Sequence, residues 1–349
     1  MTSKKFILNL SYEEIQQILL NWGEKEYRAK QIWEGLYSNL WNTSTEFTTL
    51  SKNLRERLSQ EFIFSHLDQI KKLVSQDGHT TKTLFILPDG KTIEAVLMDY
   101  KNRHTLCIST QVGCSLGCKF CATGQMGLQR NLSSGEIIEQ VLFYARTLRD
   151  KGEKINNVVY MGMGEPFLNY KATMKSIRGL NKPDGFNLGT RRFTISTVGI
   201  VPKIQEFTKE KGQVNLAISL HAADNRLRSS LLPINKKYPI EQLIEACRNY
   251  VIHTGRRVTF EWALINNIND SNNQADKLGK LLKNLNCHIN IIPLNPTKGF
   301  NGEKSRPDQV IEFQNTLARY NIPCTVRVRR GIEIQAGCGQ LVSKKSVNI

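Results

Sequence analysis

The sequence predicts an α/β protein whose core is an open, six-stranded relative of the (βα)8 barrel, preceded by a small helical domain and a β-hairpin extension. Two observations carry this prediction. From about residue 103, six short apolar runs alternate with helical patterns, which implies a parallel sheet with right-handed crossovers. Before that point, the chain changes from helical periodicity to strand-like segments. In a partial barrel of this kind, the site lies where the strands end.

The repeating part of the chain contains six predicted strands, at 104–110, 157–163, 192–197, 214–220, 257–265 and 287–293. Predicted helices between them include 133–148, 239–251 and 270–285, and residues 325–330 are a candidate for one more edge strand. Ser133 followed by Glu136 is a capping box that opens the first of these helices.

The first hundred residues divide into two parts. Apolar residues recur at helical spacing up to about residue 62, and segments 83–87 and 91–97 then flank the turn signal Pro88-Asp89-Gly90. We therefore predict four regions: a helical accessory domain for RNA binding at 1–64, a β extension at 65–99, the partial barrel at 100–335, and a C-terminal loop at 336–349 that carries Cys338.

Composition and charge indicate where the protein is found and what kind of partner it binds. No apolar run approaches the roughly 20 residues that span a bilayer, and the N-terminus has no secretory pattern, so a cytoplasmic protein without a membrane partner is expected. Lys and Arg number 48 against 31 Asp and Glu, a net charge of +17. This excess fits either a solvated basic surface or a polyanionic partner such as RNA.

Three cysteines lie within eight residues, in Cys114-Ser-Leu-Gly-Cys118-Lys-Phe-Cys121, directly after a predicted strand. Cytosolic thiols are normally reduced, so these are candidates for metal ligands. A structural zinc site needs four ligands, and electron-transfer clusters also use four cysteines. Three thiolates would instead hold three irons of a [4Fe–4S] cluster and leave the fourth iron open for a substrate.

Polar residues also stand where other predicted strands end. Gly164 and Glu165 follow the second strand, Ser196 ends the third, and Asn295 follows the sixth. The fourth strand ends in Ser219-Leu220-His221. An α/β site collects its ligands at such positions, although a glycine-rich turn or a single histidine is more often structural.

The other five cysteines differ in their surroundings. Residues 247, 287 and 324 share apolar periodicities and are predicted to be buried. Cys338 lies between two glycines near the C-terminus, where a thiol is mobile and approachable. Cys107 lies on the first predicted strand of the barrel, just upstream of the three-cysteine loop.

The CxxxCxxC spacing resembles the signature of the radical S-adenosylmethionine (radical SAM) superfamily. The resemblance becomes specific in segments 109–124, 161–166, 195–197, 219–222 and 336–339, which look like the RlmN family of adenine-C2 RNA methyltransferases and cover roughly residues 10 to 340. It implies that Cys114, Cys118 and Cys121 hold the cluster, and that Gly164, Glu165, Ser196, Ser219, Leu220, His221 and Asn295 bind S-adenosylmethionine.

The same resemblance implies a stepwise chemistry with two S-adenosylmethionine molecules per turnover. Cys338 takes a methyl group from the first, and the second is cleaved to a radical that activates this methyl for addition to carbon 2 of adenine. Cys107 then attacks the Cys338 sulfur, which releases the base and leaves a transient disulfide. Glu94 is implied as the proton acceptor, whereas without the resemblance it would be an edge-strand surface carboxylate.

The resemblance further implies the partners. The RNA substrates are an adenosine in the peptidyl-transferase centre of 23S rRNA and the adenosine just 3′ of certain tRNA anticodons, which must leave their stacks to react. A flavodoxin- or ferredoxin-type donor would reduce the cluster, and a monomer is expected.

Three alternatives remain at this point. The sister family that methylates carbon 8 of the same rRNA adenosine shares every catalytic residue named above. A conventional Rossmann methyltransferase would use the Gly162–Gly164 turn for its cofactor but leaves the three cysteines unexplained. A zinc-dependent RNA-binding protein without catalysis would hold zinc and no iron.

Overall fold

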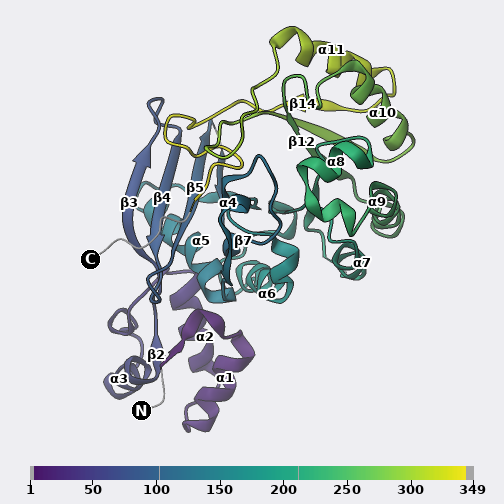
Figure 1. Cartoon of the computed structure of the whole chain (residues 1–349). Helices are drawn as coiled ribbons and strands as arrows, with labels where there is room; N and C mark the ends of the chain where they lie inside the picture. Colours follow the sequence, from purple (N-terminus) through teal and green to yellow (C-terminus); the bar gives the residue numbers. More distant parts are fainter. Residues whose placement is uncertain (1–3, 102, 211, 343–349) are drawn as a thin grey trace.

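The fold is built on one ten-stranded sheet with strand order β14-β13-β12-β11-β10-β9-β6-β5-β4-β3. The computed structural model describes residues 4–101, 103–210 and 212–342. The sheet has a parallel part, from β6 to β14, and an antiparallel part, from β3 to β5. Figure 1 shows helices α6 to α11 along the parallel part of the sheet, with α9 next to α7 and α8 above α9.

The parallel part confirms the six predicted strands. They are β6 (Arg103–Cys107), β9 (Ile155–Tyr160), β10 (Phe193–Thr197), β11 (Asn215–Ser219), β12 (Val258–Leu264) and β13 (Cys287–Pro293), and β14 (Cys324–Val326) adds the edge strand. All neighbouring pairs among them are parallel. The predicted strand at 104–110 was too long, because β6 ends at Cys107.

The helices of this part connect successive strands. They are α5 (Ser134–Arg149), α6 (Tyr170–Asn181), α7 (Val201–Lys209), α8 (Asn225–Leu231), α9 (Ile240–Thr254), α10 (Asn272–Leu282) and α11 (Pro307–Ala318). The predicted capping box is present at α5, where the Glu136 backbone N–H donates to the Ser133 hydroxyl and the Ser133 N–H donates to the Glu136 carboxylate.

The β extension is continuous with the barrel sheet. The predicted hairpin is formed by β4 (Thr80–Ile86) and β5 (Thr92–Tyr100), and a third strand, β3 (Asp68–Val74), pairs with β4. Because β5 pairs with β6, it is an interior strand, and the expectation that Glu94 lies on an edge strand is wrong. The edge is β3, whose exposed Lys71 and Lys72 discourage pairing with another chain.

The N-terminal region is helical, as predicted. It contains α1 (Tyr12–Asn21), α2 (Tyr27–Tyr37) and α3 (Lys52–Glu61), and the short strands β1 (Lys5–Phe6) and β2 (Phe62–Ile63) pair in parallel where it begins and ends. Trp33 stacks on Tyr37 with ring centroids 4.2 Å apart, and both belong to the same hydrophobic core as the barrel. The accessory helices are therefore packed on the barrel.

A small sheet that the sequence did not predict carries the three-cysteine loop. Strands β7 (Gln111–Cys114) and β8 (Gly127–Asn131) pair in antiparallel fashion, and the four-residue helix α4 (Ala122–Gln125) lies between them. Single-turn 3-10 helices occur at Ile7–Asn9, Ser44–Glu46, Pro166–Asn169, Thr190–Arg192 and Pro233–Lys236.

Two of the three cysteines that were predicted to be buried are buried in the structure. Cys247 and Cys287 are buried as predicted, but Cys324 is only half-buried, because β14 is an edge strand that leaves Val326 and Val328 exposed. Within the described residues, every helix is too short or too polar to cross a bilayer.

Candidate active site

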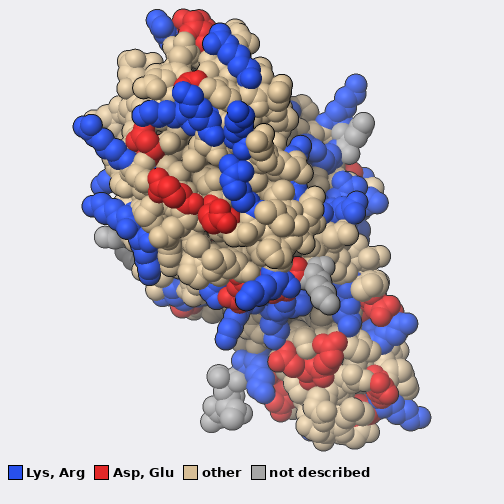
Figure 2. All heavy atoms as spheres, turned by 90° about the vertical axis from the view of Figure 1, so that its right-hand side faces the viewer, with Lys and Arg blue, Asp and Glu red and all other residues tan. Residues whose placement is uncertain are grey.

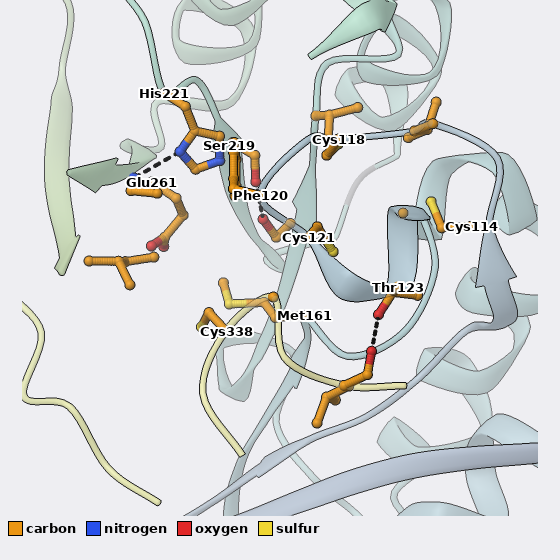
Figure 3. A pocket seen from close by; sticks show the side chains of 18 of the residues that line it. Cys114, Cys118, Phe120, Cys121, Thr123, Met161, Ser219, His221, Glu261 and Cys338 are labelled. Atoms are coloured by element: carbon orange, nitrogen blue, oxygen red, sulfur yellow. Dashed lines mark hydrogen bonds between the residues drawn. The ribbon is translucent and has the colours of Figure 1, made fainter. Parts of the chain in front are cut away.

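The three cysteines of the loop after β7 line one cavity. Cys114 and Cys118 are buried and Cys121 is half-buried. The loop needs glycine at Gly113, which has a φ of +77° and where a Cβ would meet the Gly127 carbonyl oxygen at 1.9 Å. Figure 3 shows Cys114, Cys118 and Cys121 around the loop and α4, with Cys338 below Cys121.

Burial governs the electrostatics of these thiols. Desolvation raises the pKa of Cys114 to about 12 and the pKa of Cys118 well above its usual value, and the neighbouring thiols raise both further. Burial also raises the pKa of Cys121. The thiols are therefore protonated unless a bound cation stabilises their thiolate forms. Cysteines that bind a metal behave in this way, because they lose their protons when the metal binds.

The geometry separates a single ion from a cluster. Within the described part of the chain, His, Cys, Asp and Glu do not form a group of three or more that could hold one metal ion. In this structure the three thiols are therefore not gathered around one point as a mononuclear zinc site would require. Thiolates bound to different irons of a cluster stand farther apart, so three cysteines around a shared cavity fit a cluster.

Glu165 lies at the end of the same cavity, in the turn after β9. Its side chain is buried, and its two carboxylate oxygens accept hydrogen bonds from the backbone N–H groups of Phe167 (2.9 Å) and Val198 (3.0 Å). Desolvation raises its pKa to about 7 despite these donors. Gly164 precedes it with a φ of +98°, and a Cβ there would lie 2.5 Å from the Gln111 side chain.

Two serines and a histidine extend the polar wall of the cavity. Ser196 and Ser219 end the adjacent strands β10 and β11, and their hydroxyl oxygens are 3.4 Å apart. His221 Nδ1 accepts a hydrogen bond from the Ala263 backbone N–H at 2.8 Å, so the ring carries its proton on Nε2. Burial lowers the pKa of His221 to about 3, which keeps the ring neutral.

The Cys338 loop closes the cavity from the C-terminal side. Cys338 is exposed, but its loop is anchored: the Gly339 carbonyl accepts from the Ala122 N–H at 2.7 Å, and the Leu341 carbonyl accepts from the Thr123 hydroxyl at 2.6 Å. Asn295 Nδ2 donates to the Cys338 carbonyl at 3.1 Å. The thiol is thus approachable, as expected, on a loop that is tied to the turn carrying Cys121.

Cys107, at the end of β6, shares a second cavity with Cys338. All eight cysteines are free thiols in the structure. Desolvation, with a smaller contribution from the nearby Cys338, raises the pKa of Cys107 to about 12, although Arg327 acts to lower it. Cys107 and Cys338 therefore line the same cavity, and Cys338 also lines the three-cysteine cavity.

The comparisons with known proteins agree with this geometry. Residues 108–278 match the radical SAM superfamily, and residues 6–64 match the ribosomal RNA large subunit methyltransferase N-terminal domain. The chain is 48% identical to a probable dual-specificity RNA methyltransferase RlmN of Dictyoglomus turgidum, over 96% of each chain. It is 46% identical to a protein of the same name from Chloroflexus aurantiacus, over 99% of this chain and 94% of the relative.

A solved structure shows the same fold. The crystal structure of a radical SAM methyltransferase from Sphaerobacter thermophilus matches with a TM-score of 0.95 and 47% identity, over 97% of this chain and 99% of that one. The chain belongs to the RlmN family. It is accordingly an enzyme of the radical SAM superfamily, and membership implies an iron–sulfur cluster and S-adenosylmethionine as cofactors. The alternatives of a Rossmann methyltransferase and of a non-catalytic zinc protein are wrong.

The structure gathers most of the site residues that the RlmN resemblance implied, with differences at Leu220, Asn295 and Glu94. Leu220 is fully buried in the core, and its carbonyl accepts a hydrogen bond from Arg228 Nε at 3.1 Å, so its side chain does not line the cavity. Asn295 lines the cavity but donates to the Cys338 loop. The predicted C-terminal region extends over residues 343–349, which lie outside the described residues.

Glu94 lies in a different place from the other implied RlmN residues. Its carboxylate pairs with Lys82 Nζ at 2.9 Å and accepts from the Val342 backbone N–H at 3.0 Å. It lines a pocket between the β extension and residues 333–342, and it is absent from the lining of both cavities that contain Cys338. In this arrangement the carboxylate is covered by the C-terminal segment.

Two charged residues of the site were missed by sequence reasoning. Glu261 on β12 is buried, and Arg327 follows β14; both line the three-cysteine cavity. A lone carboxylate within the apolar strand Val258–Leu264 was a signal for Glu261. Arg327 gave no signal of its own, because it begins a basic run from Arg327 to Arg330 in which no pattern marks one residue above the others.

Proposed function

We propose that the chain methylates carbon 2 of adenosine 2503 in 23S rRNA and of adenosine 37 in some tRNAs. Its relatives carry the name dual-specificity RNA methyltransferase. The observation that carries the proposal is the arrangement of five thiols, in which three line one cavity and Cys338 connects that cavity to Cys107. A methyltransferase that only positions S-adenosylmethionine beside a nucleophile does not need these five thiols.

In this proposal the thiols of Cys114, Cys118 and Cys121 would hold a [4Fe–4S] cluster. When bound, this group would supply the electron for reductive cleavage of S-adenosylmethionine. The Glu165 carboxylate and the hydroxyls of Ser196 and Ser219 provide acceptors for the ammonium and hydroxyl groups of that molecule. The neutral His221 stacks edge-on against Phe120, with ring centroids 4.9 Å apart, and thereby shapes the wall of the pocket.

Cys338 is the methyl carrier and Cys107 is the resolving thiol. An exposed thiol can reach both S-adenosylmethionine and an RNA base, whereas a buried thiol is suited to a later exchange step that needs no solvent access. Two S-adenosylmethionine molecules are consumed per turnover, one as methyl source and one as radical source. A flavodoxin- or ferredoxin-type protein supplies electrons, and the enzyme acts as a monomer.

Glu94 is proposed as the proton acceptor for the carbon-2 hydrogen. Because the Val342 N–H and Lys82 now hold its carboxylate, this role requires that the segment after Cys338 moves when RNA binds. Such a movement would also shift the Cys338 loop, since the two are only four residues apart in the chain.

RNA binding is supported by the charge distribution. Figure 2 shows Lys and Arg side chains spread over the face seen there, with Asp and Glu among them, in place of one compact patch. Arg103, Arg256 and Arg257 line a further cavity that shares Met161, Glu261 and Arg327 with the three-cysteine cavity. In this proposal these arginines, which stand at or just before the first residues of β6 and β12, add to the positive charge that attracts RNA phosphates.

One anaerobic assay tests the function. Loaded enzyme, rRNA fragments, a low-potential reductant and S-adenosylmethionine are combined, and the modified nucleoside is mapped by mass spectrometry. The proposal predicts 2-methyladenosine that depends on the reductant. Methylation at carbon 8 would assign the chain to the sister activity, and methylation without reductant would contradict the radical mechanism.

A further inference from the structure

Arg327 occupies the junction between the two cavities that contain Cys338. Its backbone N–H donates to the Ile291 carbonyl at 2.8 Å, which extends the pairing of β14 with β13 by one residue. Its guanidinium Nη1 lies 3.6 Å from the Cys338 sulfur, within hydrogen-bonding distance for a sulfur acceptor. The Arg327 side chain is 27% exposed and Cys338 is exposed, so the contact is only partly shielded from solvent.

Glu261 holds the same guanidinium from the other side. Its Oε2 lies 4.0 Å from Arg327 Nη1 and has no hydrogen-bond partner, while its Oε1 accepts from Asn290 Nδ2 at 3.2 Å. The Glu261 side chain is 5% exposed. The carboxylate therefore orients Arg327 through charge, and Arg327 keeps its donor free for the sulfur.

We propose that Arg327 is a catalytic residue that donates a hydrogen bond to the Cys338 sulfur and stabilises negative charge there, with Glu261 as its positioning residue. The inference rests on the proposed function, in which Cys338 is a nucleophile. In the first step, the Cys338 thiol gives its proton to solvent and its thiolate attacks the methyl carbon of S-adenosylmethionine. A sulfur–carbon bond forms, the methyl–sulfonium bond breaks, and its electron pair leaves with S-adenosylhomocysteine.

Other charges near this sulfur do not provide the same help. The titratable and charged groups that face Cys338 and Arg327 are Glu261 on β12, Cys107 on β6, Cys121 in the three-cysteine loop, Tyr100 on β5, and Arg329 and Arg330 in the cavity shared with Cys107. Arg329 Nε donates to Asn295 Oδ1 at 3.4 Å, and the Arg330 guanidinium lies over the Tyr100 ring at 4.7 Å, whereas Arg327 donates to the Cys338 sulfur. Attraction to Cys338 is the largest cause that raises the pKa of Arg327.

The test measures alkylation of Cys338 by iodoacetamide, followed by peptide mass mapping. Protein is produced without cluster, so that Cys338 is unmethylated, and is then loaded anaerobically; the mass of the Cys338 peptide verifies its state. At pH 7.5, Arg327→Gln should react about fivefold or more slowly than wild type, and Arg327→Lys should recover much of the rate. Arg319→Gln, which removes the same charge from an exposed site after α11, should react as wild type.

The pH profile separates charge stabilisation from misplacement of the loop. A thiolate of higher pKa is intrinsically more nucleophilic, so the Arg327→Gln variant should match or exceed the wild-type rate above about pH 10. A variant rate within twofold of wild type at pH 7.5 would overturn the proposal, and so would a deficit that persists unchanged to high pH.

A second measurement distinguishes failure of the role proposed for Arg327 from failure of the proposed function. Methyl transfer from S-adenosylmethionine to Cys338 is followed in loaded enzyme without RNA or reductant, and it should slow in parallel with alkylation in Arg327→Gln. If wild-type Cys338 takes no methyl group, the proposed function fails. The alkylation profile would still decide whether Arg327 stabilises the thiolate.

Discussion

Replacing Lys82 by Met should destabilise the folded chain by about 3 kcal/mol, because it removes one partner of a buried ion pair. The side chains of Lys82 and Glu94 are each 5% exposed, and the charged atoms are 2.9 Å apart. Breaking such a pair costs about 3 to 5 kcal/mol, since the remaining charge stays buried. We expect the lower end, because Glu94 still accepts from the Val342 N–H.

The same pair holds both ends of the Cys338 loop. Lys82 Nζ donates to the Gln335 carbonyl at 3.1 Å, and Glu94 accepts from Val342. The Lys82→Met variant should therefore increase hydrogen exchange in residues 336–341, with α1 unchanged. Stability is measured by urea unfolding, and Lys72→Met on the exposed face of β3 is the matched control, with a change within about 0.5 kcal/mol.

A double-mutant cycle tests the reasoning. The Lys82→Met/Glu94→Gln variant contains no buried charge at this place, so its loss of stability should be smaller than the sum of the single losses by at least about 1.5 kcal/mol. Additivity within about 0.5 kcal/mol would refute the account, as would loss of stability without increased exchange in the loop.

Three more predictions concern other parts of the site. Burial lowers the pKa of His221 to about 3, so between that value and about pH 6.5 the unfolded chain binds this proton and the folded chain does not. The free energy of unfolding of the wild type should therefore fall by about 2 kcal/mol more than that of His221→Gln when the pH is lowered from 7 to 5. The same pH dependence in both proteins would argue against a neutral ring. Cys107→Ala should accumulate a covalent protein–RNA adduct on denaturing gels, because the exchange step is blocked, and release of free RNA alone would remove its resolving role. Affinity for loop RNA should fall by roughly 0.7 log units per phosphate contact per decade of salt, and Arg256→Gln/Arg257→Gln should lower that slope by about one; an unchanged slope would separate these arginines from RNA.

The sequence predicted what depends on local pattern. The six apolar runs became the parallel strands because buried strands need continuous apolar character over about five residues. The three-cysteine loop was recognisable because its three thiols lie within eight residues. The two glycines beside Cys338 were interpreted as a sign of mobility, but the structure gives Gly337 a packing reason as well, because a Cβ there would lie 2.5 Å from Asn295 Nδ2.

What the sequence did not predict depends on contacts between distant segments. The enclosure of Glu94 needs Val342, which lies 248 residues away. Arg327 and Glu261 come close together because β14 and β12 lie on either side of β13. No local sequence pattern predicts this arrangement of the three strands. Strand β3 was also not delimited, because its side chains are mostly exposed and show no clear alternation.

The central claim is that three cysteines hold an iron–sulfur cluster with one open iron, and metal analysis of anaerobically prepared protein tests it most directly. Iron, acid-labile sulfide and zinc are measured together with the visible spectrum, in wild type and in Cys114→Ala, Cys118→Ala and Cys121→Ala. The account predicts about four irons and four sulfides per wild-type chain, a spectral change on addition of S-adenosylmethionine, and loss of cluster and turnover in each variant. Zinc without iron, or a variant that retains both cluster and turnover, would contradict it.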